Sequence, residues 1–236
     1  QQLECREGDI AIDDTGNVWV GCSGSEYWTA KYDTKGKNKW AVNHSSWTRG
    51  TDIAVDNAGN AYVAVFLEND WSSKLTKYNS KGIVIWEKDF SSHYYETTPP
   101  QVAVDSRGNV LVAWRDLDLG NNTDHSFLHK YNHKGEIVWQ KEISQNPLDM
   151  AVDQSGNIYL GGADIRLTKY SAEGQLVWEK IHNELSSDKE WIEALSIDDN
   201  GNVYVGANLT GSDCGQDSIW FAKYDGTGKR EWAVAY

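Results

Sequence analysis

The segments IAVDNAGNAYVAVFL (53–67) and LTKYNSKGIVIW (75–86) decide the fold of this chain. Both are rich in β-branched and aromatic residues, and each is interrupted by a short polar stretch containing glycine. This composition predicts two β-hairpins, with the turns DNAGN and NSKG. We therefore expect four short antiparallel strands between residues 53 and 86.

The same pattern occurs five times along the 236 residues. The first half is an apolar segment that ends in aspartate and is followed by a Gly-Asn pair. The five aspartates are Asp13, Asp56, Asp105, Asp153 and Asp198. In the second half, Lys-Tyr is followed by glycine four residues after the tyrosine and by tryptophan four residues after the glycine. The five tryptophans are Trp40, Trp86, Trp139, Trp178 and Trp232. Strict spacing in every copy indicates a repeat architecture.

A four-stranded sheet of this length has two apolar faces and cannot bury both alone. Stacking five such sheets around an axis buries them, so the sequence predicts an all-β, five-bladed β-propeller of four-stranded antiparallel blades. We expect one domain over residues 1–236, with the repeat tryptophans packed between neighbouring blades. The expected blades are about 8–43, 51–90, 100–143, 148–182 and 192–236.

The repeat pattern D-x-x-G-N-x-Y-V, then K-Y-x-x-x-G, then W resembles the bacterial β-propeller repeat called SBBP and the broader NHL-type repeats. The resemblance extends from about Asp9 to Tyr236. It implies a propeller fold and an extracytoplasmic setting. It implies no activity, because the motif residues are structural in that family.

Charge and composition narrow the function classes. A formal net charge of −13 disfavours binding to a phosphate backbone, so nucleic acid is not expected as a partner. No stretch approaches the roughly 18 apolar residues of a membrane span, so membrane insertion is not expected either. Apart from His125, His129 and His133, whose spacing by four does not build a metal site on a strand, the histidines lack metal-ligand spacing. No phosphate loop or nucleophile elbow is present, so we expect neither a metal nor a cofactor. The setting we expect is secreted or extracytoplasmic.

Three cysteines occur, at 5, 22 and 214. Antiparallel strand order places the connections between the second and third strands of a blade on the same face as the connections between successive blades. We call this the top face. All three cysteines fall on it, near the expected seam between the first and last blades. We predict a disulfide between Cys5 and Cys214, with Cys22 as the second choice, and three reduced thiols as the alternative.

The top connections vary in length between copies, and variable loops on a rigid scaffold commonly carry function. They hold aromatic residues beside charged and polar ones, a combination suited to sugars, whose apolar ring face stacks on an aromatic ring. The predicted ligand-binding residues are Trp47, Arg49, Asp70, Trp71, His93, Tyr95, Arg115, Asp116 and Trp191. Alternatively, these aromatic side chains cap the ends of the core.

Three functions stay open at this point. The leading prediction is a secreted, non-catalytic, lectin-like protein that binds a glycan or another small polar ligand. The second is a carbohydrate-active or other small-molecule enzyme with a pair of top-face carboxylates, for which the candidates are Asp70, Glu96 and Asp116. The third is a protein-interaction or assembly module, which would present an exposed apolar patch to a protein partner.

Overall fold

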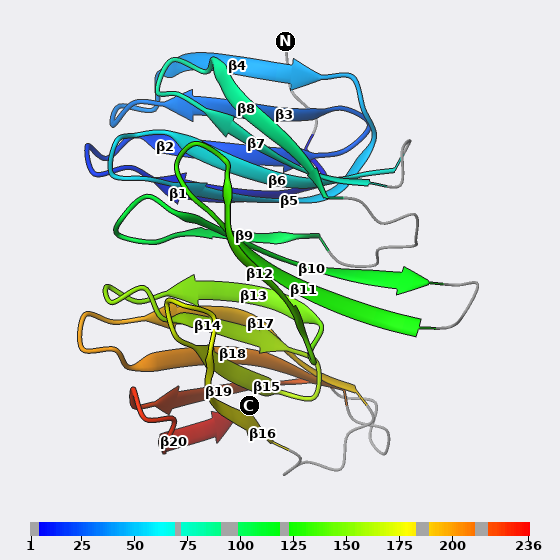
Figure 1. Ribbon diagram of the computed structural model, residues 1–236, viewed down its shortest axis with the longest axis vertical. Helices are drawn as coiled ribbons and strands as arrows, with labels where there is room; N and C mark the ends of the chain where they lie inside the picture. Colours follow the sequence, from blue (N-terminus) through cyan, green and yellow to red (C-terminus); the bar gives the residue numbers. More distant parts are fainter. Residues whose placement is uncertain (1–4, 69–71, 91–98, 119–122, 183–188, 211–216) are drawn as a thin grey trace. The chain divides into compact units, whose positions relative to one another are not determined.

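The computed structural model describes residues 5–68, 72–90, 99–118, 123–182, 189–210 and 217–236. The chain divides into two compact units, Gln1–Ile143 and Ser144–Tyr236. The described residues form twenty strands in five separate four-stranded sheets (Figure 1). All neighbouring strands within a sheet are antiparallel and consecutive in the chain, so the predicted four-stranded units are confirmed. Of the described residues, none forms a helix long and apolar enough to cross a membrane.

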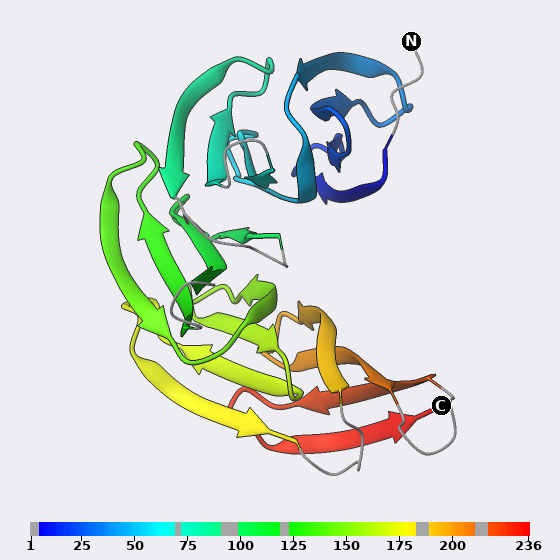
Figure 2. The ribbon, with the colours of Figure 1, turned by 90° about the vertical axis from the view of Figure 1, so that its right-hand side faces the viewer.

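The first unit contains three of these sheets. The strands of its first sheet are β1 (Glu7–Ile12), β2 (Val18–Ser23), β3 (Tyr27–Tyr32) and β4 (Asn38–His44). Those of the second are β5 (Thr48–Val55), β6 (Ala61–Leu67), β7 (Ser72–Tyr78) and β8 (Val84–Phe90). Those of the third are β9 (Gln101–Val104), β10 (Val110–Asp118), β11 (Thr123–Tyr131) and β12 (Ile137–Ile143). The first strand of the middle sheet, β5, contacts both β1 and β9 (Figures 1 and 2).

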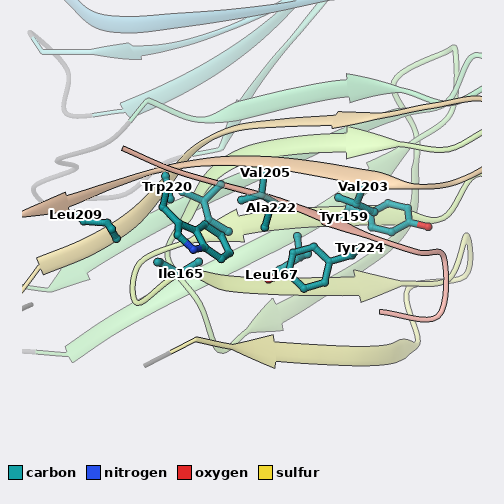
Figure 3. Close-up of a cluster of buried hydrophobic side chains, with 11 residues drawn as sticks. Tyr159, Ile165, Leu167, Val203, Val205, Leu209, Trp220, Ala222 and Tyr224 are labelled. Carbon is teal, nitrogen blue, oxygen red and sulfur yellow. The ribbon is translucent and has the colours of Figure 1, made fainter. Parts of the chain in front are cut away.

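The second unit contains the other two sheets. The strands of the fourth sheet are β13 (Pro147–Val152), β14 (Ile158–Gly162), β15 (Arg166–Tyr170) and β16 (Leu176–Ile181). Those of the fifth are β17 (Lys189–Ile197), β18 (Val203–Thr210), β19 (Asp217–Tyr224) and β20 (Arg230–Ala235). The first strands again lie beside each other, because β17 contacts β13 and β14. Figure 3 shows the core between these two sheets, where Tyr159 and Leu167 of one meet Val203, Val205 and Trp220 of the other.

The repeated aspartate forms the turn between the first two strands of every sheet. In the first copy, the Gly16 amide donates to the Asp13 carbonyl at 2.8 Å, and the Asn17 amide donates to Asp13 Oδ1 at 3.0 Å. Gly16 lies in the left-handed region, at a φ of 80°, where a side chain would be strained. The equivalent glycines of the other four copies also have positive φ values, so the predicted glycine turns are confirmed.

The same aspartate also pairs with the lysine of the Lys-Tyr motif. Lys31 Nζ lies 2.8 Å from Asp13 Oδ2, and Lys130 Nζ lies 2.9 Å from Asp105 Oδ2, with all four residues buried. Burial alone would raise the pKa of Asp13, but hydrogen bonds from Lys31, Thr15 and Asn17 lower it far below its usual range. In the three sheets of the first unit, this ion pair ties the third strand to the first turn, whereas Lys169 donates to the Gly226 carbonyl and Lys223 pairs with Glu231.

The repeat tryptophans bridge one sheet to the next within each unit. Three of them donate the indole N–H to a backbone carbonyl in the last turn of the following sheet. These bonds are Trp40 to Ser80 at 3.2 Å, Trp86 to His133 at 3.2 Å and Trp178 to Gly226 at 3.3 Å. The glycine of the receiving turn lies against the indole: a Cβ on Gly82 would be 2.6 Å from Trp40 Cδ2. Packing of Trp139 and Trp232 between blades, and the formation of a single domain by both units, stay predictions.

Candidate functional site

The candidate site is a pocket of about 490 Å³ on the top face of the first unit. Its lining comes from the start of β1, the β2–β3 and β4–β5 connections, the end of β6 and the segment before β9. The lining residues are Arg6, Glu7, Ser23, Gly24, Trp47, Thr48, Arg49, Glu68 and Pro99. We call this the Trp47 pocket. Its volume lies within the roughly 300–1,000 Å³ of small-molecule sites.

A disulfide holds the N-terminal wall of the Trp47 pocket in place. Cys5 is bonded to Cys22, with 5.6 Å between their Cα atoms. The predicted pairing of Cys5 with Cys214 is therefore wrong. The physical reason is local: β1 pairs with β2, so that Gly8 faces Cys22 and the chain just before β1 reaches the end of β2. Cys214 lies outside the described residues.

Backbone hydrogen bonds fix the same wall. The Arg6 amide donates to the Ser23 carbonyl at 3.1 Å, and the Ser23 hydroxyl donates to the Glu7 carbonyl at 3.0 Å. Both Arg6 and Glu7 have exposed side chains. Because their backbone is anchored and cross-linked, these two charged side chains are carried into the pocket wall rather than left on a free chain end.

Trp47 sits in the connection between β4 and β5, and its neighbours hold the backbone from two sides. The Thr48 amide donates to the Gly24 carbonyl at 3.1 Å, and the Glu68 amide donates to the Trp47 carbonyl at 2.9 Å. The indole itself remains 46% exposed. The guanidinium carbon of Arg6 lies 5.7 Å from the centroid of the indole ring, within cation–π distance. Trp47 therefore presents a half-exposed aromatic ring on a backbone that hydrogen bonds hold in place.

Arg49 lines the pocket beside an irregularity in β5. Arg49 pairs with Phe66 and Thr51 with Val65, so Gly50 is left over as a bulge. Gly50 has a φ of 64° and no room for a Cβ, because the ring of Pro99 packs against it. The Arg49 Nε donates to Glu68 Oε1 and forms an ion pair with it. The pocket thus presents a guanidinium and a carboxylate beside the Trp47 ring.

The other predicted ligand-binding residues are distributed differently. Arg115 and Asp116 are neighbours on β10, where Arg115 donates to both carboxylate oxygens of Asp124 at 2.7 and 2.6 Å. Trp191 belongs to the second unit and donates its indole N–H to Glu193. The remaining predicted residues lie outside the described residues: Asp70, Trp71, His93, Tyr95 and Glu96. Of the predicted set, the Trp47 pocket brings together Trp47 and Arg49.

Sequence reasoning missed Arg6, Glu7 and Glu68 as binding candidates. The first two follow Cys5 directly, so their only signal was the neighbouring cysteine. Arg6 and Glu7 line the pocket because Cys5 is bonded to Cys22, and the predicted pairing of Cys5 with Cys214 gave no indication of this position. Glu68 directly follows β6, and its role depends on the bulge that turns Arg49 toward it.

The histidines of the third sheet take structural roles. His125 Nδ1 lies 2.6 Å from Glu142 Oε1, and this hydrogen bond raises the pKa of His125. Burial lowers the pKa of His129 to about 4, beside the Trp114 ring at a centroid distance of 4.5 Å. Within the described part of the chain, no group of three or more candidate side chains could hold a metal ion.

Comparison with known proteins identifies the fold and no family. No protein-family profile and no curated protein matches the chain. A protein of unknown function from Bacteroides caccae has a similar structure, with a TM-score of 0.66 and 16% identity, over 96% of this chain and 80% of that one. BamB from Moraxella catarrhalis is similar with a TM-score of 0.56 and 14% identity, over 99% of this chain and 79% of that one.

These likenesses, together with the five four-stranded antiparallel sheets, show that the chain has a five-bladed β-propeller fold. Each four-stranded sheet is one blade. At identities of 14–16%, the likeness concerns the fold alone. Membership in the SBBP or NHL-type repeat families stays a prediction.

Proposed function

We propose that this β-propeller is a non-catalytic, lectin-like binding protein that holds a glycan in the Trp47 pocket. One observation carries the proposal: a half-exposed indole, fixed by backbone hydrogen bonds, stands beside an Arg49–Glu68 ion pair in a pocket of about 490 Å³. Sugars need both kinds of surface. The C–H face of a pyranose stacks on an aromatic ring, while charged side chains bond its hydroxyl groups.

The rigidity of the pocket supports this use. Glycans present weak, solvated contacts, so affinity depends on binding groups that lose little freedom when the sugar arrives. The Trp47 backbone is bonded on both sides, and the Arg49 side chain is already held by Glu68. Binding should therefore order few additional protein groups.

A glycan array followed by isothermal titration calorimetry tests the proposal. Trp47→Ala should weaken binding of an array hit by about 5-fold or more, because it removes an aromatic contact worth about 1–3 kcal/mol in such sites. Trp191→Ala is the matched variant, since this tryptophan was also predicted to bind ligand but lies in the second unit. If Trp191→Ala abolished binding and Trp47→Ala did not, the glycan would bind outside the Trp47 pocket. Silence across a broad array would refute the glycan proposal.

We also propose an extracytoplasmic setting, supported by the Cys5–Cys22 disulfide. Structural disulfides persist in oxidising compartments and are rare in reducing ones. Alkylation and intact-mass measurement of the protein, isolated without reductant from its native source, should show Cys5 and Cys22 protected. Full alkylation of both would contradict an oxidising compartment.

A protein-interaction module is the second candidate function. It is supported by exposed apolar side chains on the fifth blade, with Ile219 and Phe221 on β19 and Val234 on β20. Light scattering combined with Phe221→Ser tests it: a larger species that this variant converts to a smaller one would favour the module. The enzyme alternative rested on Asp70, Glu96 and Asp116, of which only Asp116 is among the described residues, and it is not proposed.

A further inference from the structure

We propose that the Trp47 pocket selects acidic sugars, namely glycans containing a uronic acid, whose ring carries a carboxylate. This inference rests on the proposed glycan-binding function and assigns a ligand class to the same site. It follows from how the two guanidinium groups of the pocket are used. Both arginines line the pocket, and both have guanidinium N–H groups with no hydrogen-bond partner among the described residues.

Of the two guanidinium groups, that of Arg6 has fewer partners among the described residues. Its backbone amide is bonded to Ser23, but its guanidinium forms no hydrogen bond or ion pair with any described residue. The group instead lies against the Trp47 ring, 5.7 Å from the ring centroid. A guanidinium has five N–H donors in a flat fork, and none of those of Arg6 meets an acceptor among the described residues. Stacking on the indole keeps this fork next to the aromatic surface where a sugar ring would lie.

Arg49 offers the second fork. Only its Nε bonds Glu68, through a single carboxylate oxygen. The outer edge formed by the two terminal nitrogens has no hydrogen-bond partner among the described residues. A carboxylate can accept two parallel N–H bonds from one such edge, at spacings that a guanidinium matches. Arg115 differs, since it already donates from two nitrogens to Asp124.

The carboxylates of the pocket shape the selectivity. Glu7 and Glu68 line the same pocket, so its two arginines are balanced and it is not a general attractor of anions. The net charge of −13 also repels densely charged polyanions. What remains is directed recognition: the ring stacks on Trp47, one sugar carboxylate bonds an unused guanidinium edge, and sugar hydroxyls donate to Glu7 or Glu68.

The test compares two probes with the same sugar rings, one with free carboxylates and one with those carboxylates neutralised as methyl esters. Isothermal titration calorimetry would measure trigalacturonic acid and its fully methyl-esterified form against the intact protein. We expect the acid to bind about 10-fold or more tightly, because hydrogen bonds to charged groups are worth about 1.5–3 kcal/mol. The preference should shrink at high salt, since it depends on charge.

Variants locate the preference. Arg6→Gln should reduce it several-fold without affecting folding, because this exposed guanidinium bonds no described residue. Arg49→Gln should also reduce it, whereas Arg115→Gln, outside the pocket, should leave it unchanged. Equal affinity for the acid and the ester would overturn the acidic-sugar inference. If an array hit still bound and depended on Trp47, the proposed function would stand. Absence of binding to either probe and to the array would refute both.

Discussion

The contact between Gly82 and Trp40 yields a sharp test of how one blade is fastened to the next. Gly82 has a φ of 78°, and a Cβ at this position would lie 2.6, 2.7 and 2.9 Å from three atoms of the Trp40 indole. Carbon atoms in contact normally stay about 3.5–4.0 Å apart. Gly82→Ala therefore introduces both backbone strain and an overlap of about 1 Å with a side chain of the preceding blade.

The two costs can be separated. A left-handed conformation costs alanine about 1–2 kcal/mol. The indole cannot swing away freely, because its N–H is bonded to the Ser80 carbonyl at 3.2 Å and its ring meets Trp19 edge-on at 5.1 Å. Overpacking of this kind costs about 1–3 kcal/mol more. The variant should thus lose about 2–5 kcal/mol in the free energy of unfolding.

Gly108→Ala is the matched control. Gly108 has a φ of 76°, but no heavy atom lies within 4 Å of its hypothetical Cβ. This variant should lose only the backbone contribution of about 1–2 kcal/mol. Urea unfolding followed by circular dichroism would measure both variants under identical conditions.

A double-mutant cycle isolates the overlap. In a Trp40→Ala background, Gly82→Ala should cost no more than Gly108→Ala does, so the coupling energy should be about 1–3 kcal/mol. If Gly82→Ala and Gly108→Ala destabilise the protein equally, or if the cycle shows no coupling, the indole does not depend on the glycine of the next blade. Contact between the indole and the glycine turn of the next blade would then not fasten the two blades together.

Three further predictions concern cross-links and ionisation. Reduction of the Cys5–Cys22 disulfide, which spans 17 residues, should lower the free energy of unfolding by about 3 kcal/mol. It should also weaken glycan binding, because it frees the wall of the Trp47 pocket. An unchanged urea midpoint in the presence of a dithiol would contradict the first expectation. Burial lowers the pKa of His129 to about 4, whereas the pKa of histidine in the unfolded chain is roughly 6.5. As the pH falls, the unfolded state therefore binds the proton first, and the free energy of unfolding should decrease between about pH 6.5 and pH 4. The loss is at most about 3 kcal/mol, and His129→Gln should flatten that part of the measured pH profile; an identical slope would exclude His129 as its cause. Asp105→Ala removes the carboxylate that lies 2.9 Å from the buried Lys130 ammonium and should cost about 3–5 kcal/mol in urea unfolding. Adding Lys130→Met should recover part of the loss, and no recovery would assign the cost to the turn instead.

Part of the candidate site could be predicted from local sequence. Trp47 and Arg49 stand out because they break the repeat pattern in a top-face connection, and an exposed aromatic beside a charge has a recognisable chemistry. The partners of these residues could not be predicted in this way. Glu68 meets Arg49 only because Gly50 forms a bulge, and a bulge shifts the register by one residue without a distinctive sequence signal.

The sequence by itself determined the blades. Strand and turn preferences act over a few residues, and five copies of the Asp, Gly-Asn, Lys-Tyr, Gly and Trp spacing predict five four-stranded sheets. Only the tertiary structure decided which side chains share the Trp47 pocket and which cysteine bonds Cys5. Those outcomes depend on the register of β1 on β2 and on how adjacent blades approach, and such distances between separate segments are not contained in any local pattern.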